Sequence, residues 1–201
     1  MYKRFFKHPA DKVVSFGGLL ITSPLVVPIL FFIYWKTKEN PFFLQRRPGM
    51  NGRVFTLIKM RTMVNLYDSE GNLLPDKDRI TRWGKFLRET SIDEIPQLIN
   101  VLKGDMSLVG PRPLLSEYLP LYSAYHRRRH QVRPGITGWA QVNGRNSIPW
   151  LQKFDLDVWY VGHVNFKVDM LIILQTIKKV FKKADINCSE EVTMPLFDGT
   201  N

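Results

Sequence analysis

The sequence predicts a mixed, mostly helical fold of the α+β class, with an N-terminal membrane-embedded segment and a small cytosolic domain. Three observations lead to this prediction. An uncharged apolar run occupies residues 13–35, one stretch at 53–63 alternates with the period of a β-strand, and residues 169–183 repeat with the period of an amphipathic helix. The expected division is 1–38 for the membrane segment, 39–184 for the cytosolic domain with its short β element, and 185–201 for an acidic tail.

The apolar run is long enough to cross a bilayer, but Pro24 and Pro28 interrupt it. A straight helix over 13–35 would reach ~35 Å, against a hydrocarbon core of ~30 Å. Pro24 lacks the N–H that would bond the Leu20 carbonyl, and the Ser23 hydroxyl can bond such a freed carbonyl instead. A break at Ser23-Pro24 predicts a re-entrant hairpin, helix-break-helix, that enters and leaves the membrane on one face. An ordinary kinked span is the alternative, because transmembrane helices tolerate proline.

Basic residues flank the apolar run on both sides, which favours a cytoplasmic location for both of its ends. They precede it as Lys3, Arg4, Lys7 and Lys12, and they follow it as Lys36, Lys38, Arg46 and Arg47.

The cytosolic domain is expected to contain one strand and several short helices. Residues 40–52 hold two prolines and two glycines, so they should form a loop. In 53–63, period two places Phe55, Leu57, Lys59 and Arg61 on one face, as either a floor beneath an anion or an edge strand protected by charge. Helices are expected at 79–88, 95–102, 114–132 and 169–183. The second should end at Gly104, and the last should lie against either the core or the membrane.

The charge balance predicts an anionic partner. The formal net charge is +11, and the four acidic residues beyond Lys183 leave about +15 on the rest of the chain. Nucleic acid, anionic lipid and phosphorylated small molecules all fit this charge. Cys188 is the only cysteine, so no internal disulfide can form. In HRRRH, His126 and His130 could share a helical face and a metal, but a solvated basic face is the expected arrangement.

The most informative stretch is RETSIDEIPQLINVLKGDMSLVGPRP, in which Asp93 and Glu94 are adjacent acids at the start of a helix. They could cap that helix, through Ser91 and Glu94 as a capping box or through Asp93, and the helix dipole would then favour ionised carboxylates. An ionised carboxylate can also be a nucleophile toward phosphorus or a ligand for Mg²⁺. Arg88 and Arg112 offer positive charge for phosphate oxygens, and two prolines hold Arg112 in a stiff, extended backbone.

Several separated motifs resemble the bacterial sugar transferases, the polyprenyl-phosphate glycosyl-1-phosphate transferases. They are RPGMNGRVFTLIKMRTM, RWGKFLRETSIDEIPQLINVLKGDMSLVGPRP, and RPGITGWAQVNGR followed by FDLDVWYV, in the family's order. The likeness runs from about Lys3 to Lys183. The single membrane segment is most similar to the short, monotopic PglC-type enzymes of bacterial N-linked glycosylation, whose membrane helix is re-entrant. The Gly162-His163 region departs from an expected Asn-rich variant, which leaves roles near it open.

The resemblance implies a phosphoglycosyl transferase that moves a sugar-1-phosphate from a UDP-sugar to polyprenyl (undecaprenyl) phosphate and releases UMP. UDP-N,N′-diacetylbacillosamine is the implied donor, and Mg²⁺ the implied cofactor. Asp93 would carry the phosphosugar and bind the metal, while Glu94 would aid proton transfer or orientation. Phosphate contacts would come from Arg88, Arg112, Arg145, Lys59 and Arg61. The implied location is the cytoplasmic face of the bacterial inner membrane, where downstream glycosyltransferases would take up the product.

Two alternatives remain open at this level. The same chemistry could use glucose, galactose or another acetamido sugar, because nothing in the sequence identifies the sugar. The chain could instead be a membrane-anchored basic module that binds nucleic acid or anionic lipid. In such a module the Asp93-Glu94 pair would have no task, so a nucleic-acid partner is not expected.

Overall fold

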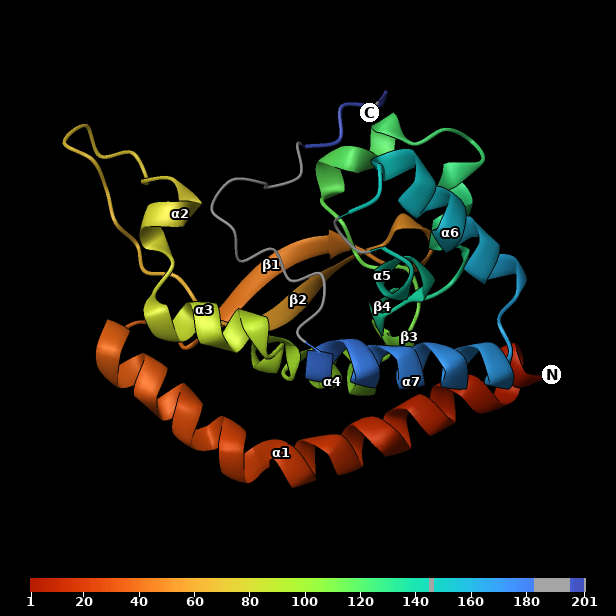
Figure 1. Ribbon diagram of the computed structural model, residues 1–201, viewed down its shortest axis with the longest axis horizontal. Coiled ribbons are helices and arrows are strands. Elements are labelled where there is room, and N and C mark those ends of the chain that lie inside the picture. Colours follow the sequence, from red (N-terminus) through yellow and green to blue (C-terminus); the bar gives the residue numbers. More distant parts are fainter. Residues whose placement is uncertain (145–146, 183–195, 201) are drawn as a thin grey trace.

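The computed structural model describes residues 1–144, 147–182 and 196–200. The chain is a mixed, mostly helical fold, as predicted (Figure 1). Its helices and strands are α1 (Lys7–Thr37), β1 (Phe42–Pro48), β2 (Val54–Met60), α2 (Asp76–Arg79), α3 (Arg82–Glu89), α4 (Gln97–Lys103), β3 (Ser107–Val109), β4 (Gly135–Thr137), α5 (Trp139–Val142), α6 (Trp150–Gly162) and α7 (Phe166–Lys182). Single turns lie at η1 (Tyr2–Phe6), η2 (Met50–Gly52), η3 (Ile92–Glu94), η4 (Ser116–Leu121) and η5 (His126–Gln131).

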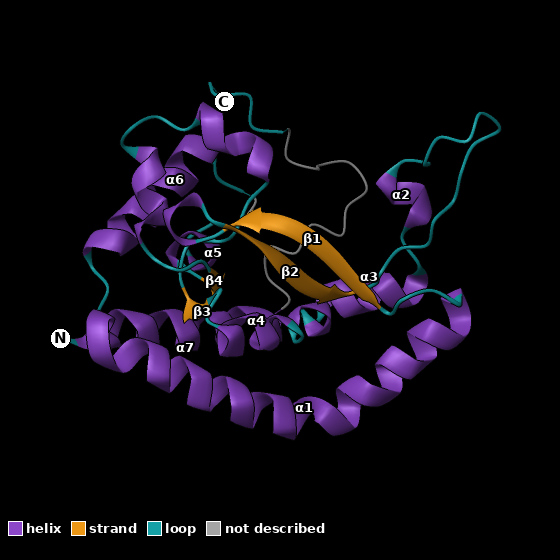
Figure 2. Ribbon diagram, turned by 180° about the vertical axis from the view of Figure 1, so that it is seen from behind, coloured by secondary structure: helices purple, strands orange, loops and turns teal. Residues whose placement is uncertain are grey.

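The elements are layered above α1. Helices α3, α4 and α7 lie next to α1, and the β1–β2 hairpin and α6 lie beyond them, on the side away from α1 (Figures 1 and 2). The strands form two small sheets, an antiparallel β1–β2 hairpin and a parallel β3–β4 pair. The long apolar helix therefore forms one boundary of the molecule.

The helix α1 runs through both prolines without a break and bends near its middle (Figure 1). The Ser23 hydroxyl donates a hydrogen bond to the Leu20 carbonyl at 2.8 Å. This is the carbonyl that Pro24 leaves without an N–H, so the hydroxyl bond predicted there is present. The predicted break is a bend within one helix, because a side-chain donor replaces the missing backbone donor.

Most apolar side chains of α1 are exposed, with exposed fractions of 81% at Ile21 and 70% at Phe31. Among the described residues, α1 is the one helix that is long and apolar enough to cross a membrane. An exposed apolar surface of this extent indicates a lipid or protein contact.

Both ends of α1 are nevertheless fixed to the same body. At the N-terminal end, Lys7 is 4% exposed and its Nζ lies 2.5 Å from Asp169 Oδ2 in α7. The next turn is held by Asp11, whose Oδ2 accepts a hydrogen bond from Ser107 Oγ in β3 at 2.5 Å.

The C-terminal end of α1 is buried on the opposite side of the bend. Ile33 is 0% exposed and packs with Met60 of β2 and Leu87 of α3. Just beyond the helix, Glu39 forms an ion pair with Arg61, with 2.7 Å between Glu39 Oε2 and Arg61 Nη1. The exposed middle of α1 is thus bounded by two anchored ends.

The β1–β2 hairpin corrects one expectation. The predicted strand is confirmed over Val54–Met60, but the loop expected at 40–52 is wrong for residues 42–48, which form β1. Pro41 precedes that strand and Pro48 ends it, so neither proline interrupts the hydrogen-bond ladder. The turn between the strands uses Asn51 and Gly52, with φ of 56° and 75°.

The short helices begin later than expected. In α3, the Thr81 hydroxyl accepts a hydrogen bond from the Gly84 N–H at 2.9 Å, so the helix starts at Arg82. The helix α4 begins after Pro96 and ends at Gly104, whose φ is 88°. The predicted stop at Gly104 is confirmed.

The helix expected at 114–132 is wrong. Residues 116–121 and 126–131 form the 3₁₀ turns η4 and η5 instead. Pro120 lacks the N–H group that a continuous helix over 114–132 would need. The turns are held by tertiary packing, since Tyr118 and Tyr122 are buried with Phe154 of α6.

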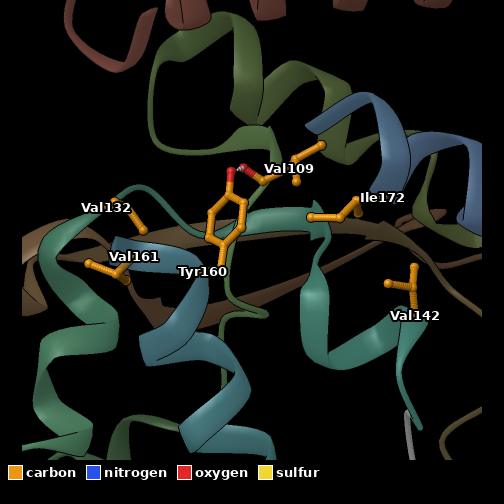
Figure 3. Close-up of a cluster of buried hydrophobic side chains, with 6 residues drawn as sticks. All are labelled: Val109, Val132, Val142, Tyr160, Val161 and Ile172. Carbon is orange, nitrogen blue, oxygen red and sulfur yellow. Dashed lines mark hydrogen bonds between the residues drawn. The ribbon is translucent and has the colours of Figure 1, made fainter. Parts of the chain in front are cut away.

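Tyr160 stands in a buried cluster that joins α6, α7 and the β3–β4 pair, with Val109, Val132, Val142, Val161 and Ile172 (Figure 3). Its hydroxyl donates to Asp169 Oδ1 at 2.7 Å and approaches the Val109 carbonyl at 3.1 Å. The predicted helix at 169–183 is confirmed as α7. Ile172 is fully buried whereas Leu174 is 65% exposed, so α7 packs on the core and also leaves an apolar face uncovered.

Candidate active site

A cavity of about 780 Å³ opens between the β1–β2 hairpin, η3, the segment after β3, and α6. Four of the predicted cations line it: Lys59, Arg61, Arg88 and Arg112. Asp93 and Glu94 line it too. The fold therefore brings together residues that are up to 53 positions apart in sequence, from Lys59 to Arg112.

Asp93 and Glu94 lie in η3, one turn before α4, and neither caps a helix. Ser91 adopts a left-handed conformation with φ of 57° and makes no side-chain cap, and Pro96 occupies the N-cap of α4. The capping interpretation is thus wrong. The left-handed turn at Ser91 instead directs the acidic pair into the cavity, and strained backbone of this kind often occurs at functional sites.

The two carboxylates differ in their partners. Glu94 Oε1 accepts hydrogen bonds from Lys59 Nζ and Arg112 Nη2, each at 2.7 Å. Asp93 is 7% exposed, yet in the described part of the chain no hydrogen-bond or ion-pair partner contacts its carboxylate. Glu94 is therefore committed to the cations, and Asp93 is free to react or to bind.

Their acidities differ accordingly. Burial raises the pKa of the Asp93 carboxyl to about 6, and the neighbouring Glu94 charge adds to the rise. Burial would also raise the pKa of Glu94, but Arg112 and Lys59 outweigh it and lower that pKa well below its usual range. The expectation that a helix dipole keeps both carboxylates ionised is corrected, because desolvation and ion pairing control the two groups.

The remaining predicted cations are held at defined places. Arg88 Nε donates to Thr62 Oγ1 at 2.9 Å, and Arg61 Nε donates to the Asn40 carbonyl at 2.7 Å. Lys59 and Arg61 line the cavity, which agrees with the floor-of-a-site interpretation of β2. Arg145 lies outside the described residues.

Sequence reasoning missed four cations of the cavity wall, namely Arg47, Arg79, Arg129 and Lys153. Arg47 was not predicted as a cavity residue because residues 40–52 were expected to form a loop. The sequence QRRP nevertheless places two adjacent cations there. Lys153 precedes Asp157 by four positions on α6, a helical spacing within KFDLD that could have placed both on one face.

The HRRRH stretch is neither a histidine metal site nor a fully solvated face. His126 Nε2 lies 3.0 Å from Asp155 Oδ1, and His130 Nδ1 lies 3.2 Å from the Gly49 carbonyl. Arg127 and Arg128 are exposed, as expected, but Arg129 is 2% exposed. The expected basic face is therefore correct only for the exposed residues of the turn.

A divalent cation suits Asp93 through shared coordination. Within the described residues, no group of three or more His, Cys, Asp or Glu side chains could enclose a metal. Mg²⁺ usually keeps several waters and binds one or two carboxylates together with substrate phosphates. The Asp93 carboxylate, which has no hydrogen-bond or ion-pair partner among the described residues, could supply one such ligand.

Comparison with known proteins identifies the family. A family model described as "Bacterial sugar transferase" matches residues 2–183. The chain belongs to this family. The match covers the part that the motifs indicate and leaves the acidic tail outside.

Relatives of this bacterial sugar transferase include short and long proteins. It is 52% identical over 198 residues to "Uncharacterized sugar transferase EpsL" of Bacillus subtilis, covering 98% of this chain and 96% of the relative. It is 39% identical to the UDP-glucose:undecaprenyl-phosphate glucose-1-phosphate transferase of Xanthomonas campestris, covering 85% of this chain and 37% of that protein. It is 36% identical to the undecaprenyl-phosphate galactose phosphotransferase of Salmonella typhimurium, covering 90% and 41%. The sugar transferase thus spans nearly all of the first relative and less than half of the other two.

Proposed function

We propose that this sugar transferase moves a sugar-1-phosphate from a UDP-sugar to polyprenyl (undecaprenyl) phosphate and releases UMP. The observation that carries the proposal is the buried Asp93 carboxylate, which has no partner among the described residues and lies in a cavity lined by guanidinium and ammonium groups. The Xanthomonas and Salmonella relatives are named for activities of this kind.

In the first step, a carboxylate oxygen of Asp93 attacks the sugar-linked phosphorus of the donor. A bond forms between that oxygen and phosphorus, and the bond from phosphorus to the bridging oxygen breaks, so UMP leaves with the electron pair. Partial desolvation makes Asp93 a stronger nucleophile while a pKa of about 6 leaves it mostly ionised at neutral pH. The product of this step is a phosphosugar esterified to Asp93.

In the second step, a phosphate oxygen of the polyprenyl phosphate attacks the same phosphorus and displaces the Asp93 carboxylate. The result is a polyprenyl-diphospho-sugar and a regenerated aspartate. One phosphate linkage replaces another, so catalysis consists mainly of positioning and charge stabilisation.

The cations have distinct tasks in this scheme. Arg88 and Arg112 would contact donor phosphates, with Lys59, Arg61 and Arg145 as further contacts. Glu94 would orient Lys59 and Arg112, because a carboxylate that two cations keep ionised is a poor proton shuttle. Asp93 would hold Mg²⁺, which would neutralise charge on the donor diphosphate when bound.

We further propose that α1 is a re-entrant membrane helix with both ends on the cytoplasmic face of the inner membrane. A helix that crossed the bilayer would separate its ends by ~30 Å of hydrocarbon. Here Lys7 and Ile33 are both buried against one polar body, while the middle of the helix is apolar and exposed. Such an arrangement supports insertion into a single leaflet, with Asp93 near the polyprenyl headgroup.

The donor sugar is a narrower proposal. The PglC-like form favours UDP-N,N′-diacetylbacillosamine, and the named relatives raise glucose and galactose as competitors. A panel of UDP-sugars, assayed for UMP release with Mg²⁺ and undecaprenyl phosphate, ranks these candidates.

The decisive experiment is trapping with a donor carrying ³²P at the sugar-linked phosphorus. Without the acceptor, label should attach to the protein, and mass spectrometry should map it to Asp93. Asp93→Asn should trap nothing and release no UMP, while Asp105→Asn, just after α4 and outside the cavity wall, should behave as wild type. If no UDP-sugar yields UMP, the rival binding module becomes the better description.

Topology needs its own test. An N-terminal tag should be protected from an impermeant reagent in sealed vesicles whose cytoplasmic face is inside. Labelling of that tag would support a full crossing instead.

A further inference from the structure

Two sequence motifs that the proposed chemistry leaves without a task meet inside the fold. Arg129 is the third arginine of HRRRH, and Asp157 is the second aspartate of FDLD. They are 2% and 3% exposed, and Asp157 Oδ2 accepts from Arg129 Nε at 3.0 Å and from Nη2 at 2.7 Å. The pair joins η5 to α6 and forms part of the cavity wall.

The same guanidinium also reaches Arg112. Arg129 Nη2 donates to the Arg112 carbonyl at 2.7 Å, and Arg112 Nη2 in turn donates to Glu94 Oε1 at 2.7 Å. Pro111 and Pro113 restrict the backbone on either side of Arg112. Three restraints therefore act on one residue: two prolines and a partly buried hydrogen bond from Arg129.

Stability alone is a poor reason for this pair. Desolvating two charges costs as much as their attraction returns, and apolar replacements of buried ion pairs are often neutral or stabilising. The planar guanidinium has fixed hydrogen-bond directions, however, and so it can hold a carbonyl and a carboxylate at set angles. Orientation is what this contact supplies.

The C-terminal segment packs against the aromatic rings that lie next to the Arg129 guanidinium. Phe197 is 4% exposed and packs against Phe154 at a ring distance of 4.9 Å, and its N–H donates to the Tyr118 hydroxyl at 3.2 Å. The Arg129 guanidinium lies 5.6 Å from the Phe154 ring and 5.5 Å from the Tyr122 ring. Phe197 therefore contacts Arg129 only indirectly, by packing on the Phe154 and Tyr122 rings that lie against the guanidinium.

We propose that Arg129 and Asp157 are a positioning pair that fixes the main chain at Arg112, and that Phe197 secures this pair, so that the C-terminal segment sets donor affinity. The proposal rests on the proposed function, in which Arg112 contacts donor phosphate. None of the three residues is assigned contact with the reacting atoms; each acts through Arg112.

The test is calorimetric binding of UDP to the full chain in phosphatidylglycerol-containing nanodiscs, with Mg²⁺. Arg129→Lys keeps the positive charge but loses the planar guanidinium that donates to both the carboxylate and the carbonyl. Asp157→Asn keeps the shape of the side chain but loses its charge. Each should raise the Kd for UDP about tenfold or more, because small misplacements of a positioning group are costly. The binding stoichiometry measures the fraction of folded protein, whereas the Kd measures the geometry of the site. If the pair only stabilised the fold, its variants would lower the stoichiometry and leave the Kd unchanged.

The matched control is Asp155→Asn. Asp155 pairs with His126 across the same two elements, but its side chain is 59% exposed and does not line the cavity. Its Kd should equal that of wild type. Phe197→Ala should raise the Kd several-fold, and its exposed neighbour Leu196, replaced by alanine, should not.

The outcomes separate the two proposals. A wild-type chain that binds no UDP would overturn the proposed function together with this inference. Tight wild-type binding, with an unchanged Kd in Asp157→Asn and Phe197→Ala, would overturn the positioning role alone. If Arg129→Lys fails to fold, those two variants still decide.

Discussion

Asp93 and Glu94 are neighbours in sequence, but their surroundings assign them opposite properties. One is desolvated and unpartnered among the described residues, and the other is ion-paired twice through one oxygen. Environments that push the pKa values of two acids apart also separate their tasks. The residue types and their order were readable from the sequence. Which of the two is free was not, because that depends on Lys59 and Arg112, which approach from other elements.

At the residue scale, the rate should follow the ionisation of Asp93. Its pKa is raised to about 6, so the nucleophilic form is lost as pH falls below that value. We expect kcat/KM for UMP release to fall about tenfold per pH unit below pH 6. Glu94 stays ionised in this range because its pKa is lowered. A flat profile between pH 5 and 7 would contradict the assignment.

The same carboxyl should make the fold less stable. Between pH 4 and 6 the folded state binds more protons at Asp93 than the unfolded state does, so its contribution to stability falls as pH rises. Asp93→Asn should therefore gain about 2–3 kcal/mol at pH 7.5 from a shift of this size, and the gain should vanish near pH 4. Thermal unfolding in detergent at pH 7.5 and pH 4 measures this gain in stability, with Asp105→Asn as the control. Equal midpoints for Asp93→Asn and wild type at pH 7.5 would argue against a desolvated carboxylate.

At the scale of elements, the sequence predicted correctly those features that depend only on residues adjacent in the chain. The helix stop at Gly104, the strand Val54–Met60 and the hydroxyl bond at Ser23 all follow from a few adjacent residues. The strand β1 and the turns η4 and η5 do not, since pairing with β2 and aromatic packing on α6 decide them. Arg47 and Lys153 were missed for this reason. Their place in the cavity depends on contacts distant in sequence.

The prolines of α1 offer a test at this scale. Replacing Pro24 and Pro28 together by leucine restores two backbone donors and removes the cause of the bend. We expect a straighter helix whose ends cannot both stay docked, with UMP release reduced at least tenfold and the N-terminal tag newly labelled. Pro9→Ala is the control, because proline is tolerated in the first turn of a helix. Unchanged activity and topology in the double variant would show that the bend does not depend on the prolines.

On the scale of the whole molecule, a buried polar network connects α1 to the core. Asp169 accepts hydrogen bonds from Lys7, Tyr2 and Tyr160, and Tyr160 belongs to the buried cluster that joins α6, α7 and the β3–β4 pair (Figure 3). Buried charges of this kind are retained only when paired. The membrane helix and the catalytic body should therefore unfold as one unit.

Breaking this connection should be costly. Lys7→Met leaves the buried Asp169 without its cation, and we expect a loss of about 3–5 kcal/mol in the free energy of unfolding. Lys12→Met, on an exposed position of the same helix, should change it by less than about 0.5 kcal/mol. Adding Asp169→Asn to Lys7→Met should recover part of the loss. Chemical unfolding in micelles followed by tryptophan fluorescence compares the three variants, and equal effects of Lys7→Met and Lys12→Met would rule out the anchoring contact.

The double anchoring of α1 has a consequence for the lipid surroundings of the enzyme. A spanning protein must match its hydrophobic length to the bilayer, and it tilts or thins the membrane when the match is poor. In the re-entrant placement proposed above, a helix tethered at both ends to one body would meet acyl chains from one side only, and its own curvature would set its immersion. Lengthening the lipid tails should therefore leave turnover almost unchanged, so the same catalytic body can work in membranes of different thickness.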